Sequence, residues 1–164
     1  MVILVGTDHT LQTTRLQLKA YLEGLCRKFN IRAIAEEMNA EALSDLNTVS
    51  SIPQRVAGVL RIPHRYCDPN RAERAKLDIR QENDIRKQAF LSNAALSESE
   101  IAACVAESHA KREQYWLMQL RNLNAWPVLF VCGADHVASF SELLALENIS
   151  VHVAVEDWAN GRNS

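Results

Sequence analysis

The chain has 164 residues, of which 18 are basic, 20 are acidic and 48% are hydrophobic, giving a net charge of −2. This balance excludes proteins that bind nucleic acid or anionic membranes through overall charge, and it suits one globular domain over residues 1–164. No apolar run is long enough to span a membrane, and residues 2–5 are too few for a signal-peptide core, so we expect a cytoplasmic protein. No zinc knuckle or disulfide framework is indicated, because no two of the four cysteines form a Cys-x-x-Cys pair: Cys26, Cys67, Cys104 and Cys132.

Two similar stretches lie near the two ends of the chain. Residues 2–9 read VILVGTDH, and residues 128–136 read VLFVCGADH. Each apolar run predicts a strand buried on both faces, which is typical of a parallel sheet covered by helices. The glycine allows a sharp turn, and Asp8 and Asp135 are well placed to cap the following helix. His9 and His136 are therefore expected at the carboxyl ends of central strands, where open α/β sheets bind ligands.

The region between these stretches predicts alternating helices and strands. Leucines at spacings of three, four and seven predict a helix over about 10–29, and residues 31–35 predict a strand that ends in Glu36 and Glu37. Shorter helices are expected over 40–46 and from Ser51, where Pro53 suits a first turn. Residues 64–67 predict a third strand, with Asp68 in the turn at its carboxyl end.

A charged segment follows the third strand. Residues 71–87 predict a helical insertion, extending over about 70–95, that is either a solvated excursion or a lid over the strand edge. Ser97 and Glu100 fit a capping box for a long helix to about residue 122. Arg112 lies on its apolar stripe, where a guanidinium needs an anionic partner unless its charged end reaches the surface.

These elements predict an α/β fold, a three-layer Rossmann-like domain with a five-stranded, mainly parallel sheet. Strand four is expected to begin at Trp126 and Pro127, strand five to cover 150–155, and residues 160–164 to be a frayed tail. We expect the strand order 3-2-1-4-5, which makes the first and fourth strands neighbours. That order brings His9, a glutamate of the pair and His136 into one crevice.

The predicted catalytic residues are those of this crevice: His9, Glu36, Glu37, Arg112 and His136. Strand alternation sends the two glutamates in different directions, and we favour Glu36 as the one facing the crevice. The secondary candidates are acidic residues near the same edge: Asp8, Asp68, Glu113 and Asp135. The other histidines, His64, His109 and His152, are interpreted as structural. The Gly6 turn lacks the further glycines of a dinucleotide fingerprint, and no nucleophile elbow or P-loop is present.

The paired Gly-x-x-His motifs, the glutamate pair and the Arg-Glu-x-x-Trp segment from Arg112 resemble a known superfamily. It groups erythromycin esterases, ChaN-like haem-binding lipoproteins, TraB/PrgY proteins and Tiki metalloproteases. The resemblance implies that His9, Glu36 or Glu37, Arg112 and His136 are site residues at one edge of an α/β sheet. The chain departs from the family in its Glu113 and Trp116, where Asn or Asp and Met are common.

The expected activity is hydrolysis of a small-molecule or peptide substrate, with His9 and Glu36 activating water and Arg112 stabilising negative charge. A metal version stays open, in which His9, His136 and Glu36 hold a divalent metal; no other cofactor is indicated. The alternative is a non-catalytic module that binds a small anionic ligand or cofactor through Arg112 and the two Gly-x-x-His turns. A third interpretation is an interaction subunit whose partner contacts residues 71–87, and homo-oligomerisation is left open.

Overall fold

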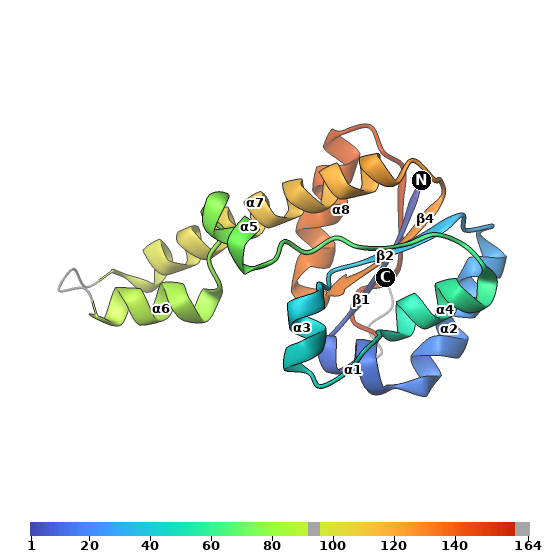
Figure 1. Ribbon diagram of the computed structural model, residues 1–164. Coiled ribbons are helices and arrows are strands. Elements are labelled where there is room, and N and C mark those ends of the chain that lie inside the picture. Colours follow the sequence, from blue (N-terminus) through green and yellow to red (C-terminus); the bar gives the residue numbers. More distant parts are fainter. Residues whose placement is uncertain (92–95, 160–164) are drawn as a thin grey trace.

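The fold is built on a five-stranded, all-parallel sheet (Figure 1). The structure is a computed structural model, and it describes residues 1–91 and 96–159. The predicted α/β class with a parallel sheet is confirmed. The predicted tail at 160–164 lies outside the described residues. The strands are β1 (Val2–Thr7), β2 (Ala33–Glu36), β3 (His64–Tyr66), β4 (Val128–Gly133) and β5 (Val151–Val155).

The strand order is β3-β2-β4-β1-β5, so the predicted order 3-2-1-4-5 is wrong in the placement of its two central strands. β1 and β4 are neighbours as expected, but β4 pairs with β2 and β1 pairs with β5. Both central strands are apolar throughout, so their patterns do not say which lies on which side. Their turns differ in what they contact. A methyl group on Gly6 would lie 1.8 Å from the carbonyl oxygen of Glu156, so only glycine admits the chain that follows β5.

Helices cover both faces of the sheet, which makes the predicted three layers. On one face, α2 (Leu16–Lys28) and α4 (Ile52–Leu60) bury a core with Ile3, Val5 and Leu129. On the other face, the carboxyl half of α7 (Glu98–Leu123) and α8 (Val137–Leu146) pack against Leu4 and Phe130. The remaining described helices are α1 (His9–Thr14), α3 (Ala40–Asp45), α5 (Arg71–Lys76), α6 (Glu82–Leu91) and the short 3-10 turn η1 (Ala134–His136).

The helix predicted over 10–29 is divided into α1 and α2 at Arg15, which has extended backbone angles. The hydroxyls of Thr13 and Thr14 donate to the backbone carbonyls of His9 and Thr10, and such local bonds compete with a continuous helix. The separate α1 lies against α4, where Arg55 donates to the carbonyl of Thr13 at 2.9 Å. The break therefore fixes α1, and with it His9, at the carboxyl edge of β1.

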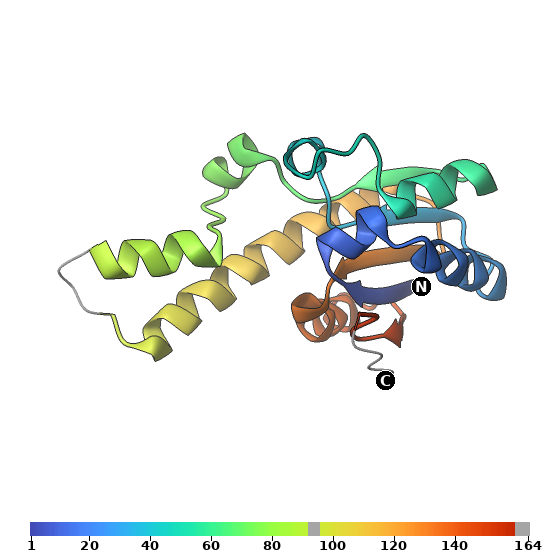
Figure 2. The same ribbon diagram turned by 90° about the horizontal axis from the view of Figure 1, so that it is seen from below.

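The charged insertion contains two helices, α5 and α6, joined by the non-helical residues 77–81. α6 runs back along the amino-terminal half of α7, and this helix pair projects away from the sheet (Figure 2). Ile85, Ala89 and Ile101 form a small core between the two helices. The capping box predicted at Ser97 and Glu100 is present at the start of α7.

Across residues 1–91 and 96–159, none of the helices combines the length and apolar character needed to cross a membrane.

Candidate functional site

Glu37 is the centre of the site, at the carboxyl edge of the sheet. Its Oε1 lies 2.9 Å from Arg112 Nη2, 3.4 Å from His9 Nε2 and 3.9 Å from His136 Nε2, and its Oε2 accepts the Gly133 amide at 2.6 Å. Burial by itself raises the pKa of Glu37, but the charge of Arg112 and the hydrogen bond from His9 outweigh it and hold the pKa well below its usual value. Glu37 is therefore a buried carboxylate that stays ionised.

The parallel pairing of β1 and β4 accounts for this convergence. Thr7 lies opposite Gly133, so the turns after both strands leave the sheet side by side. Their histidines thereby approach one oxygen of Glu37 although they lie in distant parts of the chain. The adjacency of β1 and β4 thus brings His9 and His136 to the same carboxylate, as expected.

Glu36 does not face this site, so the expectation that favoured it over Glu37 is wrong. Its Oε1 accepts from the Ser51 hydroxyl and lies 2.7 Å from His64 Nε2, on the face of the sheet covered by α4. Side chains alternate along a strand, so the last residue of β2 points to one face and the next residue is free to turn to the other. The structure consequently separates Glu36 from His9 and His136, and the proposed metal set with Glu36 is not assembled.

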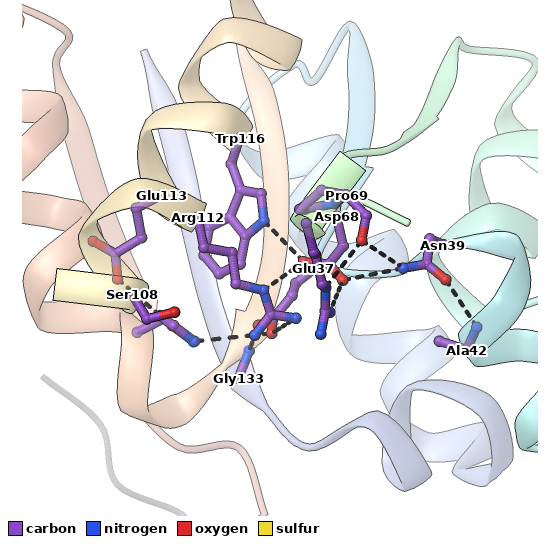
Figure 3. A network of polar contacts seen from close by, with 12 residues as sticks. Glu37, Asn39, Ala42, Asp68, Pro69, Ser108, Arg112, Glu113, Trp116 and Gly133 are labelled. Atoms are coloured by element: carbon purple, nitrogen blue, oxygen red, sulfur yellow. Dashed lines mark hydrogen bonds and ion pairs between the residues drawn. The ribbon is translucent and has the colours of Figure 1, made fainter. Parts of the chain in front are cut away.

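Asp68 is the second carboxylate that contacts the guanidinium of Arg112, at Nε, while Glu37 contacts Nη2. Figure 3 shows Arg112 between the two carboxylates, with the indole nitrogen of Trp116 directed at Asp68. Arg74 also pairs with Asp68, and Asn39 donates to it at 3.2 Å. Burial by itself lowers the pKa of Arg112, but the charges of Glu37 and Asp68 outweigh burial, and the pKa lies above its usual value. The predicted charge on the apolar stripe of α7 therefore has two buried carboxylate partners.

His136 is enclosed, unlike His9. It is 5% exposed, its Nδ1 lies 2.8 Å from Glu113 Oε1, and the Ser139 hydroxyl donates to the same oxygen at 2.6 Å. Trp116 packs edge-on against its ring. Asp135 was expected to cap the following helix, but neither η1 nor α8 has a side-chain cap, so that expectation is wrong. The first turn of α8 begins instead from the 3-10 turn that buries His136.

His9 is the accessible member of the pair. It is the first residue of α1, and Asp8 caps that helix as predicted, accepting the Leu11 amide at 2.8 Å. Its side chain is 37% exposed. Burial by itself lowers the pKa of His9, but its hydrogen bond and charge interaction with Glu37 raise the pKa above 6.5. A half-exposed imidazole paired with a buried carboxylate can exchange a proton with a bound molecule near neutral pH.

Two adjoining cavities open at this edge. The first, of about 390 Å³, is lined by Asp68, Arg74, Arg80 and Arg112 together with residues of α6 and α7. The second, of about 360 Å³, is lined by Glu37 and the residues of both glycine turns. His9, Glu82 and His109 line both cavities. Volumes of this size suit a small ligand or a short peptide segment.

His109 was interpreted as structural, and the sequence reasoning missed its position in the cleft. It lies half-buried on α7, with its ring centroid 4.3 Å from that of His136. A signal was available, because His109 precedes Arg112 by three residues and Glu113 by four on one helix. Residues at these spacings share a helix face. Glu82, from the charged insertion, was missed as a lining residue because its place depends on how α6 folds back.

The donor set does not fit a divalent metal. Within residues 1–91 and 96–159, no group of three or more His, Cys, Asp or Glu side chains could hold a metal ion. The one carboxylate oxygen that both His9 and His136 approach also pairs with Arg112 at 2.9 Å. A cation bound to that oxygen would face the guanidinium charge directly. We therefore derive no chemistry through a metal.

Comparisons of the chain with protein-family models, with curated proteins and with solved structures each found no match.

Proposed function

We propose that this protein is a hydrolase, of the erythromycin esterase, TraB and Tiki-like type, in which the pair formed by His9 and Glu37 moves protons during attack by water. The observation that carries the proposal is the His9 imidazole, half-exposed in a cleft and 3.4 Å from an ionised, buried carboxylate. A carboxylate in that position orients the ring and stabilises its protonated form. His9 can then take a proton from water and return it to a leaving group.

The other site residues support this pair. Arg112 contacts Glu37 with Nη2 and Asp68 with Nε, so its charge is balanced within the protein. We assign Arg112 the role of holding Glu37 in place, in addition to lining the first cavity. His136 and the Gly133 amide approach the two oxygens of Glu37 from the β4 turn. Glu37 is thereby fixed with one oxygen toward His9.

The proposal is tested with a panel of chromogenic esters, phosphoesters and peptides. We expect turnover of at least one class, and His9→Gln should lower kcat by about 10²- to 10⁴-fold. Because His9 is half-exposed, the variant should keep its free energy of unfolding within about 1 kcal/mol. His152→Gln is the matched control, since His152 lies exposed on β5 and packs against Phe29. A wild-type protein that hydrolyses no member of the panel contradicts the proposal.

A second candidate is a module that binds a small anionic ligand without turning it over. The observation that favours it is the lining of the first cavity, where Arg74, Arg80 and Arg112 gather. Calorimetry with inorganic phosphate distinguishes the two functions. Binding that is weakened by Arg80→Ala but unchanged by His9→Gln, in a protein without hydrolytic activity, supports the binding module.

A further inference from the structure

The cleft contains a second imidazole that can reach a bound molecule. His109 and His9 come from different helices, α7 and α1, and both line the two adjoining cavities. His136, by contrast, lines only the second cavity, is 5% exposed and has its Nδ1 engaged with Glu113. The two histidines available to a substrate are therefore His9 and His109, rather than the two of the glycine motifs.

The position of His109 is fixed by its neighbours. Its ring packs against His136 at 4.3 Å between centroids, with the planes tilted by 48°. The adjacent Ser108 exchanges hydrogen bonds with the backbone of Arg80, at 2.8 Å to the amide and 2.7 Å to the carbonyl. These bonds join α7 to the segment that leads into α6 and Glu82. His109 therefore lies on a part of the cleft wall that is held in place by hydrogen bonds and ring packing.

We propose that His109 is a further catalytic residue of this site, acting as the base for water while His9 acts as the acid for the leaving group. This inference rests on the proposed hydrolase function and divides its two proton transfers between two groups. His109 takes a proton from water as the water oxygen bonds to the attacked carbon or phosphorus. The bond to the leaving group breaks, its electron pair goes to the leaving atom, and His9 supplies that atom with a proton. Exchange with solvent then returns a proton to His9 and removes one from His109.

The electrostatic surroundings of the two rings agree with this division. Burial lowers the pKa of His109, and the charges of His136 and Arg112 lower it further, while Glu113 and Glu37 oppose that effect only in part. The pKa of His9 is raised above its usual value through Glu37, against the effects of burial and Arg112. Pairs of titratable groups pushed in opposite directions are typical of acid and base partners.

The test replaces His109 with Phe, which keeps an aromatic ring against His136 but removes both nitrogens. With the best substrate of the panel, we expect His109→Phe to lower kcat by about 10²-fold or more with a smaller change in KM. The acidic limb of the pH–rate profile should disappear in this variant, and the alkaline limb should disappear in His9→Gln. His152→Phe is the matched control, because it makes the same substitution outside the cleft. His109→Gln repeats the test if the Phe variant folds poorly.

A His109→Phe variant that keeps wild-type kcat and its acidic limb overturns this inference while leaving the proposed hydrolase intact. A wild-type protein without activity overturns the hydrolase and this inference with it. A third measurement needs no substrate: acylation by diethyl pyrocarbonate, read by mass spectrometry, should modify His9 and His109 and spare His136. Protection of His109 to the level of His136 would show that it cannot touch a substrate.

Discussion

The two Gly-x-Asp-His turns share three of four residues and lie side by side, yet they fold differently. After β1, Asp8 caps α1 and leaves His9 half-exposed in the cleft. After β4, Asp135 caps no helix, and the 3-10 turn places His136 in a buried contact with Glu113. The same short pattern therefore gives one accessible imidazole and one enclosed imidazole.

The elements that cover each turn cause this difference. The β1 turn lies next to the chain that follows β5, where Trp158 donates its amide to the Gly6 carbonyl at 2.8 Å. The β4 turn lies under α7, which supplies Glu113 and the rings of Trp116 and His109 around His136. A sequence motif at a strand end thus sets the position of a side chain, and the neighbouring helix decides its accessibility.

The largest effect is expected from removing Arg112, which holds Glu37 between the two turns. Arg112→Met takes the cation away from two buried carboxylates, Glu37 and Asp68, so it should lower the free energy of unfolding by about 3–5 kcal/mol. Urea denaturation measures the loss. Lys111→Met is the control, since its ion pairs with Glu107 and Asp78 lie at the surface and should contribute less than about 1 kcal/mol. Equal losses in the two variants would show that Arg112 does not stabilise the buried carboxylates.

The glycines of the two turns should differ in their tolerance of a methyl group. Gly6→Ala places a Cβ 1.8 Å from the Glu156 carbonyl oxygen, so it should destabilise the protein by about 3 kcal/mol. Gly133→Ala meets the end of the Glu37 side chain at 3.2 Å and the His136 ring at an ordinary contact distance of 3.7 Å, and should cost about 1 kcal/mol. Chemical denaturation of the matched pair measures both values. A larger loss in Gly133→Ala than in Gly6→Ala would contradict the observed strand order.

The two turn histidines should differ in how much each contributes to the stability of the protein. His136→Ala leaves the buried Glu113 without its imidazole partner and should lower the free energy of unfolding by about 2 kcal/mol. His9→Ala should lower it by less than about 1 kcal/mol, because the ring is half-exposed. Thermal or urea unfolding of both variants, beside their kcat values, checks the pattern. A more destabilised His9→Ala would reverse our assignment of the accessible histidine.

The smallest expected effect is a dependence of stability on pH that comes from His9. Its pKa in the folded protein is above the usual 6.5, so its contribution is fully present below about pH 6.5 and is lost as the pH rises through the folded value. The half-exposed ring limits this contribution to less than about 1 kcal/mol. Glu37 has a lowered pKa, so its contribution persists above pH 4.5 and is lost only as the pH falls through its folded value.

Unfolding free energies measured from pH 5 to pH 9 in wild type and His9→Gln check this effect. We expect the wild-type decline above about pH 6.5 to be absent from the variant. A variant that keeps the full decline would show that another group causes it.

Local signals in the sequence determined most of the secondary structure. The apolar runs gave the central strands, Ser97 and Glu100 fixed the start of α7, and Asp8 and Ser51 capped their helices as expected. Each of these features depends on residues within a few positions of one another, which is why a single sequence predicts them. The adjacency of β1 and β4 was expected from the strand order 3-2-1-4-5 and is present, although that order is wrong in the placement of the two strands.

Only the tertiary structure decided the strand order, the choice between Glu36 and Glu37, and the place of His109 in the cleft. The two central strands have equivalent apolar sequences, and they are distinguished only by the chain after β5, which packs against Gly6 of β1. The two adjacent glutamates are equivalent in the sequence. Contacts with Ser51 and His64 fix Glu36, and the contact with Arg112 fixes Glu37. Such choices depend on contacts between residues far apart in the chain, where packing space and charge pairing select among locally equivalent arrangements.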